Sequence, residues 1–367
     1  MFDLSDFCNN EFSKGKSVIL LPSQGIFSVD GWFVQEDTIF AHKDSIEGVA
    51  SYLDKTNLSE IITESDFNAF LQNINGRDLV GVATSLTKIT KSVFLNSDLA
   101  IVTCNTEESD SITNAEQCES FLRNKSMEVF NSLNIIRFIY CDLSVPDKLP
   151  HVPGYWNNSE GYLGAFILNP NGINKIIAGR EMGGAVSYGI GIGLESSNVL
   201  GMEHHPLLEP LTHASLGVVG EMIKHALKIY NRAMYLNNET LKFITVMALF
   251  EYLGTGDKYT NFKKVRAKLQ AHISTNIQEY NKLSEQFQLF TSKKHEEKNI
   301  GYRTKIIHEG ALIEDLLPDI NDRVDLFRDL TEYTQKIIRG MYPFIGQDLS
   351  ALQEHRQKLL NNIGIQT

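Results

Sequence analysis

The spacing of apolar residues changes near residue 205, and this change constrains the fold more than any other feature of the sequence. Before it, short apolar runs alternate with turn residues, which is the pattern of strands. After it, long stretches carry apolar residues at helical spacing. We therefore predict an α+β protein, with a β-rich mixed domain over residues 1–205 and an all-α helical bundle over residues 206–367.

The spacing of apolar residues also locates individual elements. A chain of 367 residues exceeds what one hydrophobic core usually serves, which agrees with two domains. In the first region we expect one helix over residues 114–133 and strands at residues 17–21, 79–83, 92–95, 99–102 and 135–140. In the second region we expect helices over residues 210–235, 241–253, 259–290 (kinked around 274–276), 298–317, 319–342 and 349–360.

Charge and cysteine content narrow the class of protein. A formal net charge of −11 argues against nonspecific coating of nucleic acid, although a local basic patch is enough for an RNA site. The four cysteines include no Cys-x2-Cys pair, so we expect no cysteine-bound zinc and reduced thiols in a cytoplasmic protein. The start of the chain has no signal-peptide pattern, and no run of about 18 apolar residues predicts a membrane span.

Arg303 and His308 form the most specific chemical pattern in the chain. Arginine holds a fixed positive fork for phosphate oxygens, and histidine exchanges a proton near neutral pH. Together, the two groups can cleave RNA without a metal, with the ribose 2′-hydroxyl as the nucleophile. Five residues of an ideal α-helix turn through about 140°, so a facing helix or a symmetry mate would have to complete the cleft. The alternative is a surface arginine and a core-edge histidine five residues apart by chance.

The stretch of chain around this pair is positively charged, whereas the chain as a whole has a negative net charge. Between residues 258 and 308, acidic side chains are limited to Glu279, Glu285, Glu296 and Glu297. The same stretch has eleven basic residues, an excess that is typical of phosphate contact, whereas the alternative is a solvated helix face. Within it, the candidate RNA-binding residues are Lys263, Lys264, Arg266 and Lys268.

Three stretches of the C-terminal region resemble a HEPN domain, most closely its Apea-like branch. Residues 250–253 (Phe-Glu-Tyr-Leu) are similar to the family's Leu-Glu-x-Leu segment, and the basic stretch 262–273 is similar to the segment that follows. Residues 303–310 resemble the Arg-x4-His-x-Gly signature. The resemblance covers roughly residues 206–367.

This resemblance implies a ribonuclease fold that forms a homodimer and needs neither metal nor cofactor. Arg303 would bind the scissile phosphate, and His308 would act as general base or general acid. The products would carry a 2′,3′-cyclic phosphate and a 5′-hydroxyl. Glu251 would orient one of these two residues, or would be a helix-packing carboxylate; both roles stay open.

Two positions depart from the family pattern. Thr304 stands where many active members have Asn, His or Asp, and Gly310 stands where toxin members regulated by a nucleotidyltransferase have Tyr. Beside the pair, Lys305 is a candidate supporting cation. Tyr302 would stack on a base or, as the more common alternative, pack as a core aromatic residue.

Other sites find little support. Residues 189–193 alternate Gly and Ile but lack the third glycine of Gly-x-Gly-x-x-Gly, and residues 203–205 (Glu-His-His) have no further ligand at metal-site spacing. No Gly-x-Ser-x-Gly occurs. The expected function is thus an endoribonuclease, in prokaryotic antiviral defence or growth arrest as the resemblance implies. The alternatives are a catalytically silent dimerisation or RNA-binding module and a small-ligand sensor that uses the N-terminal domain.

Overall fold

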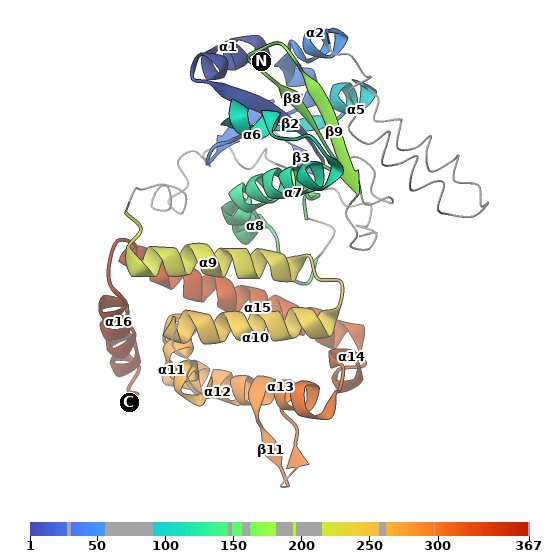
Figure 1. Cartoon of the computed structure of the whole chain (residues 1–367). Helices are drawn as coiled ribbons and strands as arrows, with labels where there is room; N and C mark the ends of the chain where they lie inside the picture. The colour runs from blue at the N-terminus through green and yellow to red at the C-terminus, as the bar shows by residue number, and fades with distance from the viewer. Residues whose placement is uncertain are drawn as a thin grey trace, which may run out of the picture. The chain divides into compact units, whose positions relative to one another are not determined.

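A computed structural model of the chain divides into two compact units (Figure 1). One unit comprises Met1–Leu133 and Asp147–Leu200, and the other comprises Asn134–Pro146 and Gly201–Thr367. The structure describes residues 1–27, 31–55, 91–145, 149–155, 162–180, 194–195, 215–256, 262–296 and 298–365.

The first unit is built on a six-stranded antiparallel sheet in the order β4-β5-β7-β2-β8-β9. Its central strand β2 is buried along nearly all of its length, which is why its sequence is a continuous apolar run rather than an alternating one. Two parallel pairs of two-residue strands, β1 with β6 and β3 with β10, accompany the sheet. The strands are β1 (Phe2–Asp3), β2 (Lys16–Ser23), β3 (Ile26–Phe27), β4 (Trp32–Gln35), β5 (Thr38–Ala41), β6 (Ile46–Glu47), β7 (Asp98–Asn105), β8 (Tyr162–Leu168), β9 (Lys175–Arg180) and β10 (Leu194–Glu195).

Helices pack on this sheet, and their apolar side chains complete its core. Leu4 and Cys8 of α1 lie in one buried cluster with Leu20 of β2, Phe94 of α5 and Phe166 of β8. The helices of this unit are α1 (Leu4–Ser13), α2 (Val49–Asp54), α5 (Lys91–Asn96), α6 (Thr106–Asp110) and α7 (Ala115–Ser132).

The structure confirms the strands predicted at residues 17–21 and 99–102 and the helix predicted at 114–133. The strand predicted at residues 92–95 is wrong, because these residues belong to α5. A run of four apolar or small residues has too little periodicity to distinguish the two structures. The strand predicted at residues 79–83 lies outside the described residues.

The strand predicted at residues 135–140 is also wrong, because these residues form α8 (Asn134–Tyr140). This helix belongs to the helical unit: the buried guanidinium of Arg137 donates to Asn231 on α9 at 2.8 Å. Nearby, Lys242 of α10 donates to the Leu143 carbonyl at 3.1 Å. Residues 134–146 therefore interrupt the N-terminal domain that the sequence placed at residues 1–205.

The second unit is a helical bundle in which α10 is the central helix. It contacts α9, α11, α14 and α15, which explains why its residues are apolar on nearly all sides. A small hairpin of β11 and β12 adds strand to a unit that was expected to be all-α. Besides α8, the helices and strands of this unit are α9 (Gly217–Met234), α10 (Glu239–Thr255), α11 (Phe262–Ile273), α12 (Ile277–Thr291), β11 (Lys294–His295), β12 (Lys298–Asn299), α13 (Tyr302–Thr304), α14 (Ile313–Leu316), α15 (Ile320–Met341) and α16 (Leu349–Asn362).

The long helix predicted over residues 259–290 is two helices, and the break falls where a kink was expected. The Asn276 side chain accepts the Glu279 backbone N–H, and the Glu279 carboxylate accepts the Thr275 N–H in return. This reciprocal cap starts α12 anew. Sheet and bundle together make the chain an α+β protein, as predicted. Within the described residues, no helix is both long and apolar enough to cross a bilayer.

Candidate functional site

The segment that carries Arg303 and His308 is not the single helix predicted over residues 298–317. It is α13, followed by a π-helical turn at Lys305–Glu309, and then α14 after a short break. Gly310 ends the π-helical turn with a φ of 70°, a left-handed conformation that glycine adopts without steric cost. The Gly310 N–H donates to the Lys305 carbonyl, the five-residue spacing that defines this rare turn.

Two contacts fasten this segment to the end of α12. A Cβ atom on Gly301 would lie 2.5 Å from the Thr291 carbonyl oxygen, so only glycine allows the backbones to approach this closely. The Thr304 hydroxyl donates to the same carbonyl at 2.7 Å. Thr304, the residue that departs from the family pattern, thus has a structural contact of its own. The sequence shows only a Gly-Tyr step before the arginine and gives no sign of this docking.

Arg303 forms a two-point ion pair with Glu251 of α10. The Nη1 atom lies 2.6 Å from Oε1 of the carboxylate, and Nη2 donates to Oε2 at 3.4 Å. The side chains are 31% and 23% exposed, so the pair lies at the surface of the bundle. Of the roles that the sequence left open for Glu251, the geometry matches orientation of Arg303. The other N–H groups of the guanidinium make no hydrogen bond within the described residues.

His308 lies in the π-helical turn, and its side chain is exposed. Within the described residues, its imidazole makes no hydrogen bond or ion pair. Hydrogen bonds between residues five apart widen the turn, so positions 303 and 308 lie nearer to one face than an α-helix would place them. Lys305 begins the same turn and is partly buried.

Tyr302 packs against the interior of the bundle. Its ring centroid lies 6.2 Å from that of Phe243 and 6.4 Å from that of Phe290. Burial raises the pKa of its hydroxyl, and the negative charge of Asp322 adds to this effect. The geometry therefore agrees with aromatic packing rather than with a ring free to stack on a base.

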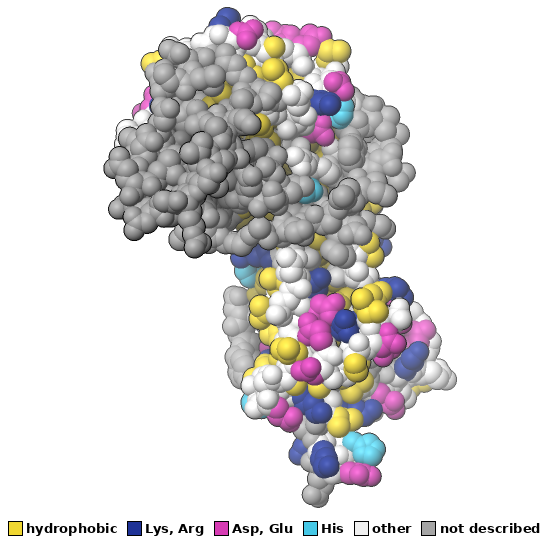
Figure 2. All heavy atoms as spheres, turned by 90° about the vertical axis from the view of Figure 1, so that its right-hand side faces the viewer, with side chains coloured by type: hydrophobic (Ala, Val, Ile, Leu, Met, Phe, Trp, Pro, Cys, Tyr) yellow, Lys and Arg dark blue, Asp and Glu magenta, His cyan; other side chains and the backbone are white. Residues whose placement is uncertain are grey.

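The four basic residues proposed for RNA contact lie on α11, but they do not form one exposed row. Lys268 is partly buried, and both this burial and the nearby positive charge of Arg356 lower its pKa. Arg266 is partly buried, and the structure does not describe the side chains of Lys263 and Lys264. On the face seen in Figure 2, basic and acidic side chains of the described residues are interspersed. Residues 189–193 and 203–205 lie outside the described residues.

Comparison of the chain with protein-family models, with curated proteins and with solved structures gives no match. The resemblance to HEPN domains therefore rests on the three sequence stretches named above alone.

Proposed function

We propose that the helical unit is a metal-independent endoribonuclease whose reacting groups are Arg303 and His308. The observation that carries the proposal is the ion pair of Arg303 with Glu251, in the same short segment as the exposed His308. A carboxylate that holds a guanidinium at two points orients its remaining N–H groups without burying them. The resemblance assigns phosphate binding to the same arginine.

The reaction removes one proton from the RNA and adds one proton to it. An imidazole takes the proton of the 2′-hydroxyl, and the oxygen attacks the adjacent phosphorus. The bond from phosphorus to the 5′-oxygen breaks, and this oxygen receives a proton from a second acid. The guanidinium of Arg303 stabilises the negative charge that gathers on the phosphoryl oxygens. A homodimer that brings two His308 side chains to one cleft would supply both the base and the acid.

A second candidate is a catalytically silent RNA-binding or dimerisation module. Two observations favour it: Glu251 occupies two N–H positions of the Arg303 fork, and the Thr304 hydroxyl is bound to the Thr291 carbonyl. In an active enzyme, the phosphate must use the outer N–H groups of Arg303 or displace Glu251. A role in prokaryotic antiviral defence or growth arrest goes with the enzymatic proposal, by analogy with the resembled family.

The test is cleavage of total RNA by the purified full chain in excess EDTA. Arg303→Ala and His308→Ala should each abolish a cleavage that EDTA leaves intact. Arg328→Ala and His295→Ala are matched controls, because both side chains are exposed and lie outside the proposed site. The controls should cleave as the wild type does. Equal cleavage by all five proteins, or cleavage that stops in EDTA, would contradict the proposal.

A further inference from the structure

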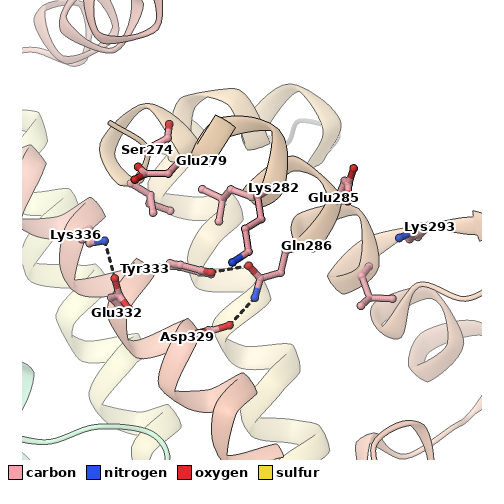
Figure 3. A pocket seen from close by; sticks show the side chains of 13 residues that line it. Ser274, Glu279, Lys282, Glu285, Gln286, Lys293, Asp329, Glu332, Tyr333 and Lys336 are labelled. Carbon is pink, nitrogen blue, oxygen red and sulfur yellow. Dashed lines mark hydrogen bonds and ion pairs between the residues drawn. The ribbon is translucent and has the colours of Figure 1, made fainter. Parts of the chain in front are cut away.

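A polar groove lies between α12 and α15 (Figure 3), and neither Arg303 nor Glu251 lines it. Its volume of about 570 Å³ falls in the range of small-molecule sites. Charged and polar side chains line it from both helices, and Lys293 lines it beyond the end of α12. This groove was not predicted from the sequence, because α13 and α14 separate its two walls along the chain.

A chain of hydrogen bonds forms the floor of the groove. The Tyr333 hydroxyl donates to Oε1 of Gln286 at 2.6 Å, and Nε2 of Gln286 donates to Oδ2 of Asp329 at 2.5 Å. The Tyr333 hydroxyl and one N–H of Gln286 are used in this chain, so the floor offers the second oxygen of Asp329 and the lone pairs of Tyr333 as acceptors and the second N–H of Gln286 as a donor. Asp329 and Tyr333 are partly buried, and this burial raises the pKa of both groups.

The carboxylates at the rim are mostly engaged elsewhere. Glu332 pairs with Lys336 at 2.6 Å. Glu279 accepts the backbone N–H and the hydroxyl of Thr275, and these hydrogen bonds lower its pKa. Glu285 points away from Tyr333 (Figure 3).

Two lysines at the rim keep their charge free. Neither Lys282 nor Lys293 forms an ion pair with any described residue. The Lys282 side chain reaches toward Tyr333 and Gln286, as Figure 3 shows, while Lys293 lies farther along the groove. The groove thus combines a polar floor that contains the Asp329 carboxylate with two ammonium groups that form no ion pair with a described residue, and the charge of Lys282 acts on Asp329.

We propose that this groove binds a guanine nucleotide, with the N–H edge of the base on Asp329 and the phosphate between Lys282 and Lys293. Guanine presents two neighbouring N–H donors, on N1 and on the exocyclic N2, to a carboxylate. Adenine presents a lone pair at N1, which a carboxylate repels. The Asp329 carboxylate therefore favours guanine, which presents two donors to it, over adenine, which presents a lone pair beside its amino group.

The nucleotide has two possible sources, a free guanosine phosphate and a guanosine within RNA. The RNA form of the proposal rests on the proposed function, whereas the free-nucleotide form does not. The groove and the Arg303 segment share the end of α12: the Lys293 carbonyl accepts the backbone N–H groups of Ile300 and Gly301 at 2.8 and 3.1 Å. A guanosine bound in the groove would thus lie on the same support as the proposed cleavage site.

Calorimetric titration of the full chain with GMP, AMP and ribose 5-phosphate tests the proposal without any substitution. We expect GMP to bind at least about tenfold more tightly than AMP, since adenine presents one donor and one lone pair to the Asp329 carboxylate where guanine presents two donors. In a second arm, Arg303→Ala protein is titrated with RNA hexamers that contain one guanosine or only adenosines. Binding of GMP identifies the free nucleotide as a ligand, and preference for the guanosine hexamer alone identifies RNA.

Substitutions assign the contacts. Asp329→Asn should weaken guanine binding at least about tenfold, whereas Asp325→Asn, on the same helix but outside the groove, should not. Lys282→Ala should weaken binding of GMP and of ribose 5-phosphate alike, with Lys358→Ala as its control. Equal affinity for GMP and AMP together with no preference between the hexamers would overturn the proposal, as would Asp329→Asn protein that binds guanine like the wild type. Binding of GMP is measured without any RNA cleavage. A failure of the guanine-binding proposal can therefore be distinguished from a failure of the proposed nuclease function.

Discussion

Two arginines of the helical unit have opposite surroundings. Arg303 is 31% exposed, and a carboxylate holds it at two points. Arg356 of α16 is 1% exposed; its Nε donates to the His272 ring and its Nη2 to the Leu253 carbonyl, each at 2.9 Å. Its Nη1 has no hydrogen-bond partner, and no carboxylate among the described residues pairs with it.

The difference separates an arginine that holds the fold together from one that can take a ligand. Burial lowers the pKa of Arg356 to about 10, and the guanidinium links α16 to α10 and α11 through neutral acceptors. Arg303 keeps a solvent-facing side, and its carboxylate partner is the kind of group that a phosphate can replace. Four predictions, in order of decreasing effect, test this distinction.

Arg356→Ala should lower the free energy of unfolding by about 3–5 kcal/mol, the usual cost of removing a large buried side chain. Arg356→Met should cost less than half as much, because it fills most of the volume and removes the unpaired charge. Denaturant unfolding of the full chain measures both. A loss below about 1 kcal/mol for Arg356→Ala would show that the bundle does not depend on this residue.

Arg303→Ala should have a large effect on RNA cleavage and a small effect on stability. We expect RNA cleavage to fall by about 10²–10³-fold, as for loss of a group that stabilises the transition state. The free energy of unfolding should change by no more than about 1 kcal/mol, because the ion pair lies at the surface. Single-turnover cleavage and denaturant unfolding, measured on the same preparation, check the two expectations. Destabilisation as large as that of Arg356→Ala would make Arg303 structural as well.

The buried neighbour of Arg356 predicts a pH dependence of stability. Burial, and then the charges of Arg356 and His355, lower the pKa of His272 from 6.5 to about 3. The unfolded chain therefore binds a proton that the folded chain excludes, and this stability, present above pH 6.5, is lost as the pH falls toward 3. The slope reaches about 1.4 kcal/mol per pH unit.

His272→Gln should remove that part of the slope, because glutamine accepts the Arg356 N–H but does not titrate. Unfolding of both proteins at pH 7, 6 and 5 gives the comparison, in which all other titrating groups cancel. Parallel curves would mean that His272 is not held neutral by burial.

The smallest effect is expected at Thr304. Thr304→Val removes the hydroxyl that donates to the Thr291 carbonyl and should cost about 1 kcal/mol. Thr304→Ser keeps the donor and should preserve both stability and cleavage. If valine and serine behave alike in thermal unfolding and in cleavage, the hydrogen bond does not hold the segment.

The predictions from sequence are confirmed where the pattern of apolar residues within one helix or strand is consistent along its length. The helix at 114–133 has several turns of consistent periodicity, and the strand at 17–21 is a buried apolar run between turn residues. Residues 135–140 have the same apolar texture as a strand, but the partners of Arg137 on α9, 94 residues away, favour a helix. The apolar pattern of so short a run does not indicate which distant residues it contacts.

The candidate site follows the same rule. Spacing predicted Arg303 and His308 as a pair, but the contact of Glu251 with Arg303, across 52 residues, is visible only in the structure. The sequence also did not predict the π-helical turn, nor the docking of Gly301 and Thr304 on the end of α12, which is a tertiary contact. For the same reason, the run of positive charge around α11 did not show that Lys268 lies near Arg356.

The central claim is attack by the ribose 2′-hydroxyl at a site that needs no metal, and the ends of the RNA products test it most directly. A defined RNA oligomer, cleaved by the full chain in EDTA and analysed by mass spectrometry, should give a 2′,3′-cyclic phosphate and a 5′-hydroxyl. An oligomer with a single 2′-deoxynucleotide at the cleaved position should stay intact. Products with a 5′-phosphate, or cleavage of the deoxy-substituted oligomer at the same position, would contradict the account.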